Sequence, residues 1–308
     1  MISGDDVLLT ETRGHVYVLT INRPERYNAL SVELGDRLNE ELERFNADPE
    51  LWVMILTAAG DKAFCSGMDL KEFSELTERG ETAFIRPPFS SSNHPFVASW
   101  KPIIAAINGY AYAGGWMLAQ RCDLRIMSEK ATLGVTENSW NLAAPFIAEK
   151  GVFPTSAIAA EVALMARPIT AQRAYEIGFV NKVVAPERLM DETMDWANHL
   201  CSLGQEAVRG HKQLLYYGSW APSSEIMTLG LDIFYWMGKG KPGVVVDSTV
   251  GSRAFAEKRK PDFSEMFNPK RFRCAECGSE YVVAKGNGTG LPTCHGQPLE
   301  EVRRKAGA

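Results

Sequence analysis

The sequence predicts an α/β fold that continues into a helical segment and ends in a small metal-bound β appendage. Three observations lead to this prediction. Short apolar strands alternate with amphipathic helices, the strand pattern fades after about residue 187, and three of the six cysteines crowd residues 274–308. With 308 residues, 45% hydrophobic and 23% charged, the chain suits one large globular domain, or one domain plus an appendage.

The clearest unit is a strand, a helix and a second strand near the start of the chain. Residues 15–22 and 51–60 are short, apolar and β-branched, which is typical of strands. Between them, apolar residues recur every three or four positions, so one face of a helix is apolar, with Ser31 as its N-cap. The apolar positions are Leu30, Leu34, Leu38, Leu42 and Phe45. A β-α-β order predicts parallel strands joined by a crossover helix.

The same alternation continues and then gives way to helices. We expect strands over 101–113, 124–135 and 179–186, and helices over 114–123, 170–178, 187–204, 205–218 and 223–240. Thr170 begins one of these helices, and Gly178 follows its end. The stretch 84–96, rich in Pro and Ser, is expected to be a loop before the strand at 101.

Composition also limits the partners that we expect. The net charge of −5 is mild, and no basic stripe with interleaved aromatic residues occurs, so we expect no nucleic-acid partner. The acidic start of the chain does not read as a signal peptide, and no apolar run is long enough for a membrane span. The uneven cysteines argue against a disulfide framework, so we expect a cytoplasmic protein in a reducing compartment.

Two strand-to-helix turns carry glycine. One is Gly67-Met68, and the other is Gly114-Gly115. Glycine lets the main chain approach a ligand closely, and N–H groups at a helix start have no intrahelical acceptor. Two such donors aimed at one oxygen would form an oxyanion hole. The alternative is that both are tight turns that packing alone requires.

Five motifs in order resemble the enoyl-CoA hydratase/isomerase family, the crotonase superfamily. They are AFCSGMDLKEF, KPIIAAINGYAYAGG, DLRIMSEKATLGVTE, ITAQRAYEIGFVNKVV and AFAEKRKPDF, and the resemblance covers roughly residues 5–265. It implies a crotonase-like superhelix of repeated ββα turns with a helical C-terminal segment. It also implies homotrimers or homohexamers and coenzyme A thioester substrates.

The resemblance also assigns residues. By position, the N–H groups of Met68 and Gly114 would hold the thioester carbonyl as negative charge develops on it. Arg26 would lie near the coenzyme A phosphates, and the main chain around Met68, Asp69 and Leu70 would lie against the adenine. Phe255 and Lys258 match residues near the coenzyme, often of a neighbouring subunit. For Arg26 and Lys258, a solvated surface charge is the alternative.

One of the two glutamates that hydratases of the family usually carry is absent. Its position, three residues beyond the oxyanion-hole glycine, is Met117, whereas Glu137 matches the second glutamate. A single carboxylate can move a proton between two carbons, which is double-bond isomerisation, and family hydratase-lyases also depend on this glutamate. Apolar neighbours would raise the pKa of Glu137. The alternative is that Glu137 only caps or pairs locally.

Other residues in the sequence are weaker candidates for roles in the active site. Trp140 is expected to be a pocket wall. His94 is a further candidate base, and Glu149 is a conceivable second acid. The nucleophilic aspartate of the family's dehalogenases would fall at Pro145, so that branch is disfavoured.

The end of the chain predicts a metal site. Cys274 and Cys277 form a knuckle, and Cys294 and His295 follow seventeen residues later. Three sulfurs and an imidazole complete a tetrahedral zinc shell. The segment resembles a desulforedoxin-like or zinc-ribbon knuckle in which His295 replaces a cysteine, and this favours structural zinc over iron redox chemistry. The intervening residues 279–293 are expected to form a hairpin. A redox Cys-x-x-Cys pair and an unstructured tail are the alternatives.

These observations divide the chain into a ββα core at 1–200, a helical trimerisation segment at 201–268 and a zinc-knuckle appendage at 269–308. The leading hypothesis is a single-glutamate enoyl-CoA hydratase or isomerase. An acyl-CoA hydrolase or carbon–carbon lyase on the same scaffold is one alternative. A catalytically degenerate coenzyme A thioester binding or scaffold protein is another.

Overall fold

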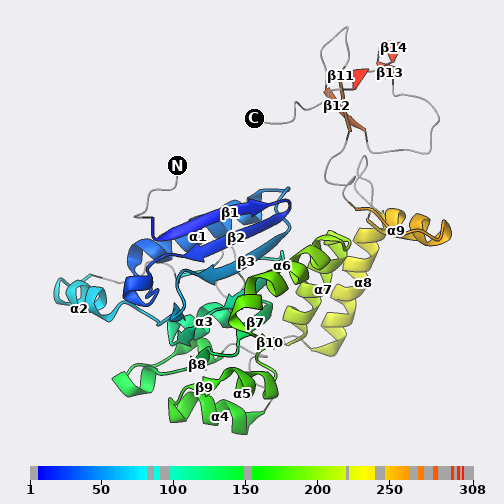
Figure 1. The fold of residues 1–308 in the computed structure, drawn as a ribbon. Helices are drawn as coiled ribbons and strands as arrows, with labels where there is room; N and C mark the ends of the chain where they lie inside the picture. Colours follow the sequence, from blue (N-terminus) through cyan, green and yellow to red (C-terminus); the bar gives the residue numbers. More distant parts are fainter. Residues whose placement is uncertain are drawn as a thin grey trace. The chain divides into compact units, whose positions relative to one another are not determined.

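The computed structural model forms two compact units (Figure 1). The first contains Met1–Cys201 and Leu215–Trp220, and the second contains Ser202–Leu214 and Ala221–Ala308. The described residues are 6–81, 87–90, 98–148, 155–219, 222–239 and 247–263, together with the short strands 270–273, 280–283, 293–294, 297–298 and 300–301. The predicted loop at 84–96 is described only at 87–90, where the chain is neither helix nor strand.

The larger sheet of the first unit has six strands in its described part. In spatial order they are β1 (Leu8–Arg13), β2 (Val16–Ile21), β3 (Val53–Ala58), β5 (Ile103–Ile107), β7 (Leu124–Ser128) and β10 (Lys182–Val184). β1 and β2 form an antiparallel hairpin that the sequence did not indicate. The remaining neighbours are parallel, including β2 and β3, so the predicted crossover is confirmed.

The smaller sheet of this unit has four described strands. They are β4 (Ala63–Cys65), β6 (Tyr110–Tyr112), β8 (Thr132–Gly134) and β9 (Ile169–Thr170). β4, β6 and β8 are mutually parallel, and β9 is antiparallel to β8. The chain passes from a strand of the large sheet to one of the small sheet and then to a helix. This is the repeated ββα pattern expected for a crotonase-like fold.

Two long strand predictions were wrong in detail. The stretch 101–113 forms β5 and β6, and the stretch 124–135 forms β7 and β8, each pair divided between the two sheets. The breaks fall at Asn108-Gly109 and at Glu129–Ala131, where the chain turns. A Cβ atom on Gly109 would lie 2.4 Å from the carbonyl oxygen of Lys62, so close passage of two chain segments requires glycine there.

Helices and short 3₁₀ turns connect the strands of the first unit. They are η1 (Pro24–Arg26), α1 (Val32–Ala47), α2 (Leu70–Glu78), α3 (Gly114–Gln120), η2 (Glu137–Trp140), η3 (Pro145–Ala148), α4 (Ser156–Met165), α5 (Ala171–Glu176), η4 (Pro186–Arg188) and α6 (Leu189–Cys201). The predicted caps are confirmed. Ser31 Oγ accepts from Leu34 N–H at 3.1 Å, and Thr170 Oγ1 accepts from Arg173 N–H at 3.2 Å.

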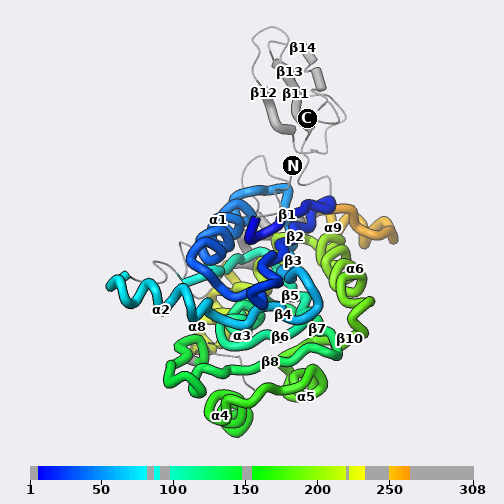
Figure 2. The backbone as a smooth tube through the Cα atoms, turned by 60° about the vertical axis from the view of Figure 1, so that its left-hand side comes forward, coloured from blue at the N-terminus to red at the C-terminus, as the bar shows by residue number. Residues whose placement is uncertain are grey.

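The hydrophobic core lies between these helices and the sheets. Leu34, Leu38, Leu42 and Phe45 of α1 are fully buried, as their spacing predicted. α6 packs against β2, β3, β5 and β7 of the larger sheet (Figure 2). α3 packs against β4 and β6, so the smaller sheet and α3 form a second buried layer.

The second unit contains helices and short strands. α7 (Gln205–Gly218) contributes residues to both units, and it is followed by α8 (Ser223–Lys239) and α9 (Asp247–Ala256). The described strands are β11 (Lys270–Arg273), β12 (Glu280–Val283), β13 (Thr293–Cys294), β14 (Gln297–Pro298) and β15 (Glu300–Glu301). The hairpin predicted at 279–293 lies mostly outside the described residues, and of the residues in this range β12 pairs with β11 and Thr293 of β13 pairs with β14.

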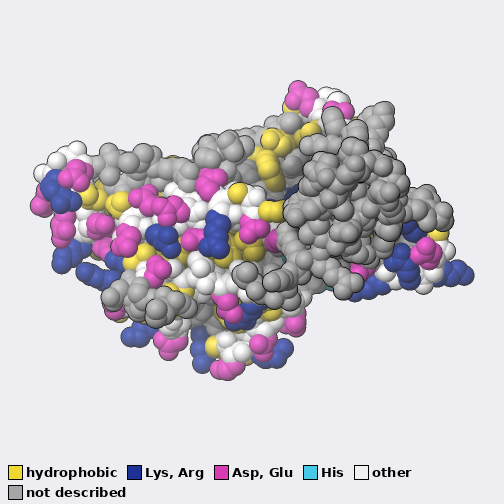
Figure 3. Space-filling model, turned by 90° about the horizontal axis from the view of Figure 1, so that it is seen from above, with side chains coloured by type: hydrophobic (Ala, Val, Ile, Leu, Met, Phe, Trp, Pro, Cys, Tyr) yellow, Lys and Arg dark blue, Asp and Glu magenta, His cyan; other side chains and the backbone are white. Residues whose placement is uncertain are grey.

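Charged side chains of both signs lie on the face of the molecule seen from above (Figure 3). In Figure 3, acidic and basic side chains are interspersed over the described part of the face that it shows. Among the described helices, none has the length and apolar character needed to cross a bilayer.

Candidate active site

Three neighbouring strands end at the residues that the sequence singled out. Met68 follows β4, Gly114 follows β6, and Glu137 lies three residues beyond the end of β8. Because these three strands are parallel neighbours, their carboxyl ends lie along one edge of the small sheet. Adjacent strands are about 4.8 Å apart, so residues far apart in the sequence meet within a small region.

The two glycine turns are in direct contact. A Cβ atom on Gly67 would lie 3.3 Å from the amide nitrogen of Gly114, and one on Gly114 would lie 3.5 Å from the Cα atom of Gly67. Gly67 also has φ of 99°, which side chains disfavour. A Cβ atom on Gly115 would lie 2.0 Å from the carbonyl oxygen of Cys65. The close packing at the two turns therefore requires glycine at 67 and 115, whereas a Cβ atom on Gly114 would meet mainly the movable Leu30 side chain, at 2.7 Å.

The Met68 turn is fixed by an isolated parallel β-bridge to Leu30. The Leu30 N–H donates to the Gly67 carbonyl at 2.8 Å, and the Asp69 N–H donates to the Leu30 carbonyl at 2.9 Å. Successive N–H groups of an extended chain point to opposite sides, so the Met68 N–H points away from Leu30. Met68 precedes Asp69, the N-cap of α2, so it lies just outside the helix start that the sequence indicated.

The Gly114 turn is fixed from the other side. Gly114 is the first residue of α3, where an N–H has no intrahelical acceptor. The preceding Ala113 donates its N–H to the Gly134 carbonyl at 2.9 Å and has φ of 52°. A non-glycine residue in this region stores backbone strain, typically about 1–3 kcal/mol. Among the described residues, the structure records no protein acceptor for the N–H of Met68 or of Gly114.

Glu137 is buried and partly unsatisfied. Its side chain lies at the start of η2, is 9% exposed, and its Oε2 has no hydrogen-bond partner among the described groups. Loss of solvent raises the pKa of Glu137 above its ordinary value, and main-chain N–H groups of Glu137 and Thr136 offset only part of this effect. A buried acid with a free oxygen suits proton transfer.

The other residues that the sequence indicated around Glu137 contribute no described polar group beside it. Met117 packs into the hydrophobic core, and α3 contains no acidic residue, so this helix brings no second carboxylate. Trp140, which we expected to line a pocket, is 66% exposed in the single chain. His94 and Glu149 lie outside the described residues.

Some of the residues assigned to coenzyme A lie together. Arg26 ends η1 and is exposed, and Leu70, which begins α2, is 41% exposed. Asp69 Oδ2 accepts from Arg23 Nη2 at 3.0 Å, within a pair that is largely buried. Burial alone would raise the pKa of Asp69, but the hydrogen bonds from Arg23 and from the Glu72 N–H, with the charges of Arg23 and Arg26, leave it below its ordinary value.

Sequence reasoning missed Arg23 and Asn28 as organisers of this region. Arg23 Nη1 donates to the Ala29 carbonyl at 2.5 Å, and the Arg23 N–H donates to Asn28 Oδ1 at 2.9 Å. Asn28 is buried and has φ of 54°, a conformation that asparagine tolerates better than most residues. The spacing Arg-Pro-x-x-x-Asn was the available signal.

Phe255 and Lys258 belong to the second unit. Phe255 is the next-to-last residue of α9, and its side chain is 87% exposed. Lys258 follows the helix, is exposed and has φ of 53°. The Lys258 N–H donates to the Phe255 carbonyl at 3.1 Å, which closes the helix end. Both side chains are therefore free to meet another molecule.

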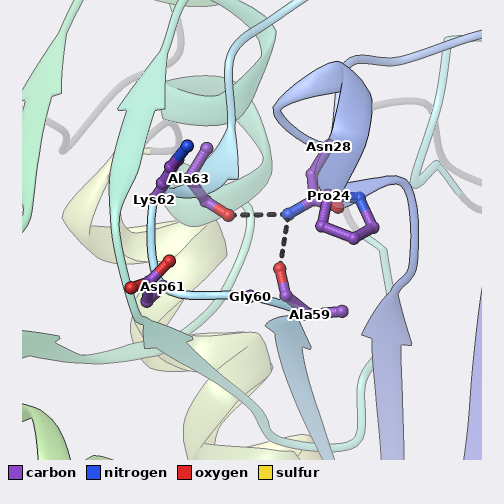
Figure 4. A pocket seen from close by; sticks show the side chains of 7 residues that line it. All are labelled: Pro24, Asn28, Ala59, Gly60, Asp61, Lys62 and Ala63. Carbon is purple, nitrogen blue, oxygen red and sulfur yellow. Dashed lines mark hydrogen bonds between the residues drawn. The ribbon is translucent and has the colours of Figure 1, made fainter.

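A pocket of about 180 Å³ lies at the amino end of β4, opposite the end that carries Gly67 (Figure 4). Its lining residues are Pro24, Asn28, Ala59, Gly60, Asp61, Lys62 and Ala63. Asn28 Nδ2 donates to the carbonyls of Ala59 and Ala63 at 3.0 and 2.7 Å, and these bonds connect three of the residues that line the pocket. The pocket contains none of the predicted catalytic residues.

The predicted zinc ligands lie beyond what the structure describes. Cys274, Cys277 and His295 are outside the described residues, and Cys294 is described only as the last residue of β13. Within the described part of the chain, no group of three or more His, Cys, Asp or Glu side chains could hold a metal ion.

Comparisons with known proteins agree with this architecture. The enoyl-CoA hydratase/isomerase family model matches residues 11–266. The (E)-benzylidenesuccinyl-CoA hydratase of Thauera aromatica is 35% identical over 82% of this chain and 97% of its own. The mevalonyl-coenzyme A hydratase of Aspergillus fumigatus is 33% identical over 81% of this chain and 91% of its own.

Solved structures give the same result. The crystal structure of an enoyl-CoA hydratase from Mycobacterium tuberculosis is 31% identical, covers 83% of this chain and 98% of its own, and superposes with a TM-score of 0.73. The family model covers most of the chain, and the repeated ββα fold is shared. The chain therefore belongs to the enoyl-CoA hydratase/isomerase family, the crotonase superfamily, and is an enzyme of that type.

Proposed function

We propose that the protein is a single-glutamate enoyl-CoA hydratase or isomerase that stabilises a thioester enolate with main-chain N–H groups. The observation that carries this proposal is the shared edge of β4, β6 and β8. There, two amides without a described protein acceptor lie near a buried acid with a free oxygen. Such amides can stabilise an oxyanion, and such an acid can transfer protons.

In this mechanism, the Met68 and Gly114 N–H groups bind the thioester carbonyl oxygen. Glu137 removes or delivers a proton on the acyl chain. Returning the α-proton at the γ-carbon moves the double bond, whereas activating a water molecule at the β-carbon gives hydration. The absence of an acidic residue on α3 favours a reaction that one carboxylate can complete. The names of the relatives, both hydratases of coenzyme A thioesters, support the hydration branch.

The coenzyme A part of the substrate would contact Arg26 and the chain at Met68, Asp69 and Leu70. Since the Asp69 carboxylate is paired with Arg23, we assign its contact to the main chain and the phosphate contact to Arg26. Phe255 and Lys258 would complete the site, and their exposure suits contact with a coenzyme bound to a neighbouring subunit.

A panel of α,β- and β,γ-unsaturated acyl-CoA thioesters tests this proposal. A 3-hydroxyacyl product identifies a hydratase, and a shifted double bond identifies an isomerase. Release of free coenzyme A, or of a ketone or aldehyde, identifies the alternative hydrolase or carbon–carbon lyase. Binding without turnover of any thioester identifies a degenerate scaffold protein. We expect Glu137→Gln to lower kcat by at least about 100-fold, with Glu129→Gln, an exposed change, as the control.

We further propose that residues 269–308 bind structural zinc through Cys274, Cys277, Cys294 and His295. Residues 274–279 join the paired strands β11 and β12, and residues 295–296 join β13 and β14. In the sequence, Cys274 and Cys277 lie between the antiparallel strands β11 and β12, Cys294 ends β13, and His295 follows it. The family match ends at residue 266, so this appendage is additional to the family fold.

We propose a cytoplasmic homotrimer or homohexamer, with residues 1–200 as the core and 201–268 as the trimerisation segment. Leu215, Met227 and Leu231 on α7 and α8 are 79%, 67% and 61% exposed. Exposed large apolar side chains such as these favour a role in protein–protein contacts. Light scattering of the purified chain would measure the assembly.

A further inference from the structure

The segment that carries Glu137 is hydrogen-bonded at both of its ends to residues near Gly114, namely Ala113 and Gln120. Before Glu137, the Ala113 N–H donates to the Gly134 carbonyl at 2.9 Å. After it, Gln120 at the end of α3 donates from Nε2 to the Phe146 carbonyl at 2.8 Å. Residues 135–145 therefore lie between two hydrogen bonds to the strand and helix that flank Gly114.

Gln120 is itself held in one orientation. Its Oε1 accepts from Trp116 Nε1–H at 3.0 Å, which directs its Nε2 toward Phe146. The Trp116 ring is fully buried and stacks on Phe179 with ring centroids 4.2 Å apart. The Arg125 guanidinium lies 4.8 Å from the centroid of the Phe179 ring and donates to the Cys122 carbonyl at 2.5 Å. The side chain of Gln120 thus projects from a rigid, packed layer.

Between its two ends, the Glu137 segment has two further described hydrogen bonds, while Val135 and Phe146 at its flanks are buried in the core. The Leu142 N–H donates to the Glu137 carbonyl at 3.1 Å, and Asn138 Nδ2 donates to the Ala163 carbonyl at 2.8 Å. The first bond lies within the segment, and the second reaches α4, so neither sets its position relative to α3. The bond from Gln120 to Phe146 does so directly.

We propose that Gln120 is a positioning residue that fixes the Glu137 carboxylate relative to the Gly114 amide. This inference rests on the proposed function of those two groups. Gln120 does not touch the reacting atoms in this account. It acts by holding Phe146 and thereby the far end of the segment. Because displacing a catalytic group by about 1 Å can lower a rate about 100-fold, loss of this bond is expected to lower turnover.

Two variants distinguish the contributions of the two described side-chain hydrogen bonds of Gln120, with Trp116 and with Phe146. Gln120→Leu removes both, whereas Gln120→Glu keeps the acceptor for Trp116 and removes the donor to Phe146. Gln172→Leu is the matched control, because Gln172 makes an exposed side-chain bond to Glu176 on α5. We expect kcat to fall about 10- to 100-fold in both Gln120 variants, with KM changed less than about threefold and the control unchanged. Should Gln120→Leu not fold, Gln120→Glu carries the test.

A double-mutant cycle with Glu137→Gln distinguishes positioning from general damage. If Gln120 acts through Glu137, adding Gln120→Glu to Glu137→Gln lowers kcat little further. Full additivity, or a fall in kcat no larger than in Gln172→Leu, overturns the inference.

Crystal structures of the wild type and Gln120→Leu give a readout that needs no turnover. We expect the Phe146 carbonyl and the Glu137 carboxylate to move together in the variant, and unmoved groups overturn the inference. An inactive wild type would contradict the proposed function instead, and this structural comparison would still decide the positioning role.

Discussion

The turn at Gly114 leaves no room for a side chain on Gly67, because a Cβ atom there would lie 2.8 Å from Ala113 Cβ and 3.3 Å from the Gly114 amide nitrogen. A Cβ atom on Gly114 would lie 3.5 Å from the Cα atom of Gly67, although the two residues are 47 positions apart in the sequence. The parallel pairing of β4 and β6 brings their ends together. The amides of Met68 and Gly114, the proposed oxyanion hole, belong to these two turns.

Substitutions at the paired glycines are expected to differ in cost. A Cβ atom on Gly115 meets the main chain of Cys65 at 2.0 Å, whereas one on Gly114 meets the movable Leu30 Cδ1 at 2.7 Å. Gly115→Ala should therefore lower the free energy of unfolding by more than about 3 kcal/mol, and Gly114→Ala by about 1 kcal/mol. Denaturant unfolding measures both.

The control for this pair is Gly218→Ala at the end of α7, where a Cβ atom meets nothing within 4 Å. It should change the unfolding free energy by less than about 0.5 kcal/mol. Gly114→Ala should nevertheless reduce kcat/KM, since its methyl group enters the space between the two turns. Equal stability of the Gly114 and Gly115 variants would contradict this packing.

The Arg23–Asp69 ion pair is expected to stabilise the Met68 turn. Asp69→Asn keeps an N-cap for α2 but leaves Arg23 without its carboxylate, so we expect a loss of about 2 kcal/mol at pH 7. The pKa of Asp69 is below its ordinary 3.8, so this stabilisation is present above pH 3.8 and is lost as pH falls through the lowered pKa. Thermal unfolding across pH measures it.

The exposed pair of Arg13 and Glu11 provides the comparison. Its side chains are 52% and 54% exposed, and such pairs contribute little. Glu11→Gln should cost less than about 0.5 kcal/mol. A cost at Asp69 no larger than at Glu11 would show that burial of the Arg23 pair is unimportant.

The buried carboxylate of Glu137 is expected to lower the stability of the folded protein at neutral pH. Its pKa is raised in the folded protein, so the folded state holds the proton more tightly than the unfolded state. Stability therefore falls as pH rises from the ordinary 4.5 through the raised pKa, and the full penalty is present above that range. Glu137→Gln should unfold at a higher temperature than the wild type at pH 7, and the difference should vanish below pH 4.5.

Glu129→Gln, an exposed change elsewhere in the chain, is the control variant in this experiment. A Glu137→Gln protein that is less stable than the wild type at neutral pH would contradict the burial argument.

Removal of zinc is expected to unfold only the appendage. Metal analysis should find about one zinc ion per chain, and Cys277→Ser should abolish it. Cys201→Ser is the control, because burial raises the pKa of the Cys201 thiol to about 11 and this residue is not a predicted ligand. Full zinc content in Cys277→Ser would exclude the proposed ligand set.

Local patterns in the sequence predicted much of the fold. The leucine spacing of α1 and the caps at Ser31 and Thr170 depend on nearby residues, and these predictions were correct. The division of 101–113 between two sheets depends on the partners of each strand, which a local apolar pattern does not contain. The hairpin of β1 and β2 was missed for the same reason, and α4, whose sequence is mostly apolar, gave no clear helical period.

The site was predicted less evenly. The two glycine turns and Glu137 each follow a strand, as expected, but the sequence did not indicate that these strands, β4, β6 and β8, are neighbours. The Arg23–Asp69 pair joins residues 46 positions apart, and the link from Gln120 to Phe146 joins residues 26 apart. These contacts follow from tertiary packing, and no spacing in the sequence indicates them.

The structure of the Glu137→Gln variant with a bound enoyl-CoA thioester tests the central claim most directly. The account predicts a thioester carbonyl oxygen about 2.7–3.1 Å from the amide nitrogens of both Met68 and Gly114, with the acyl chain beside residue 137. A carbonyl oxygen that is bound by side chains or solvent, away from either amide, would contradict it.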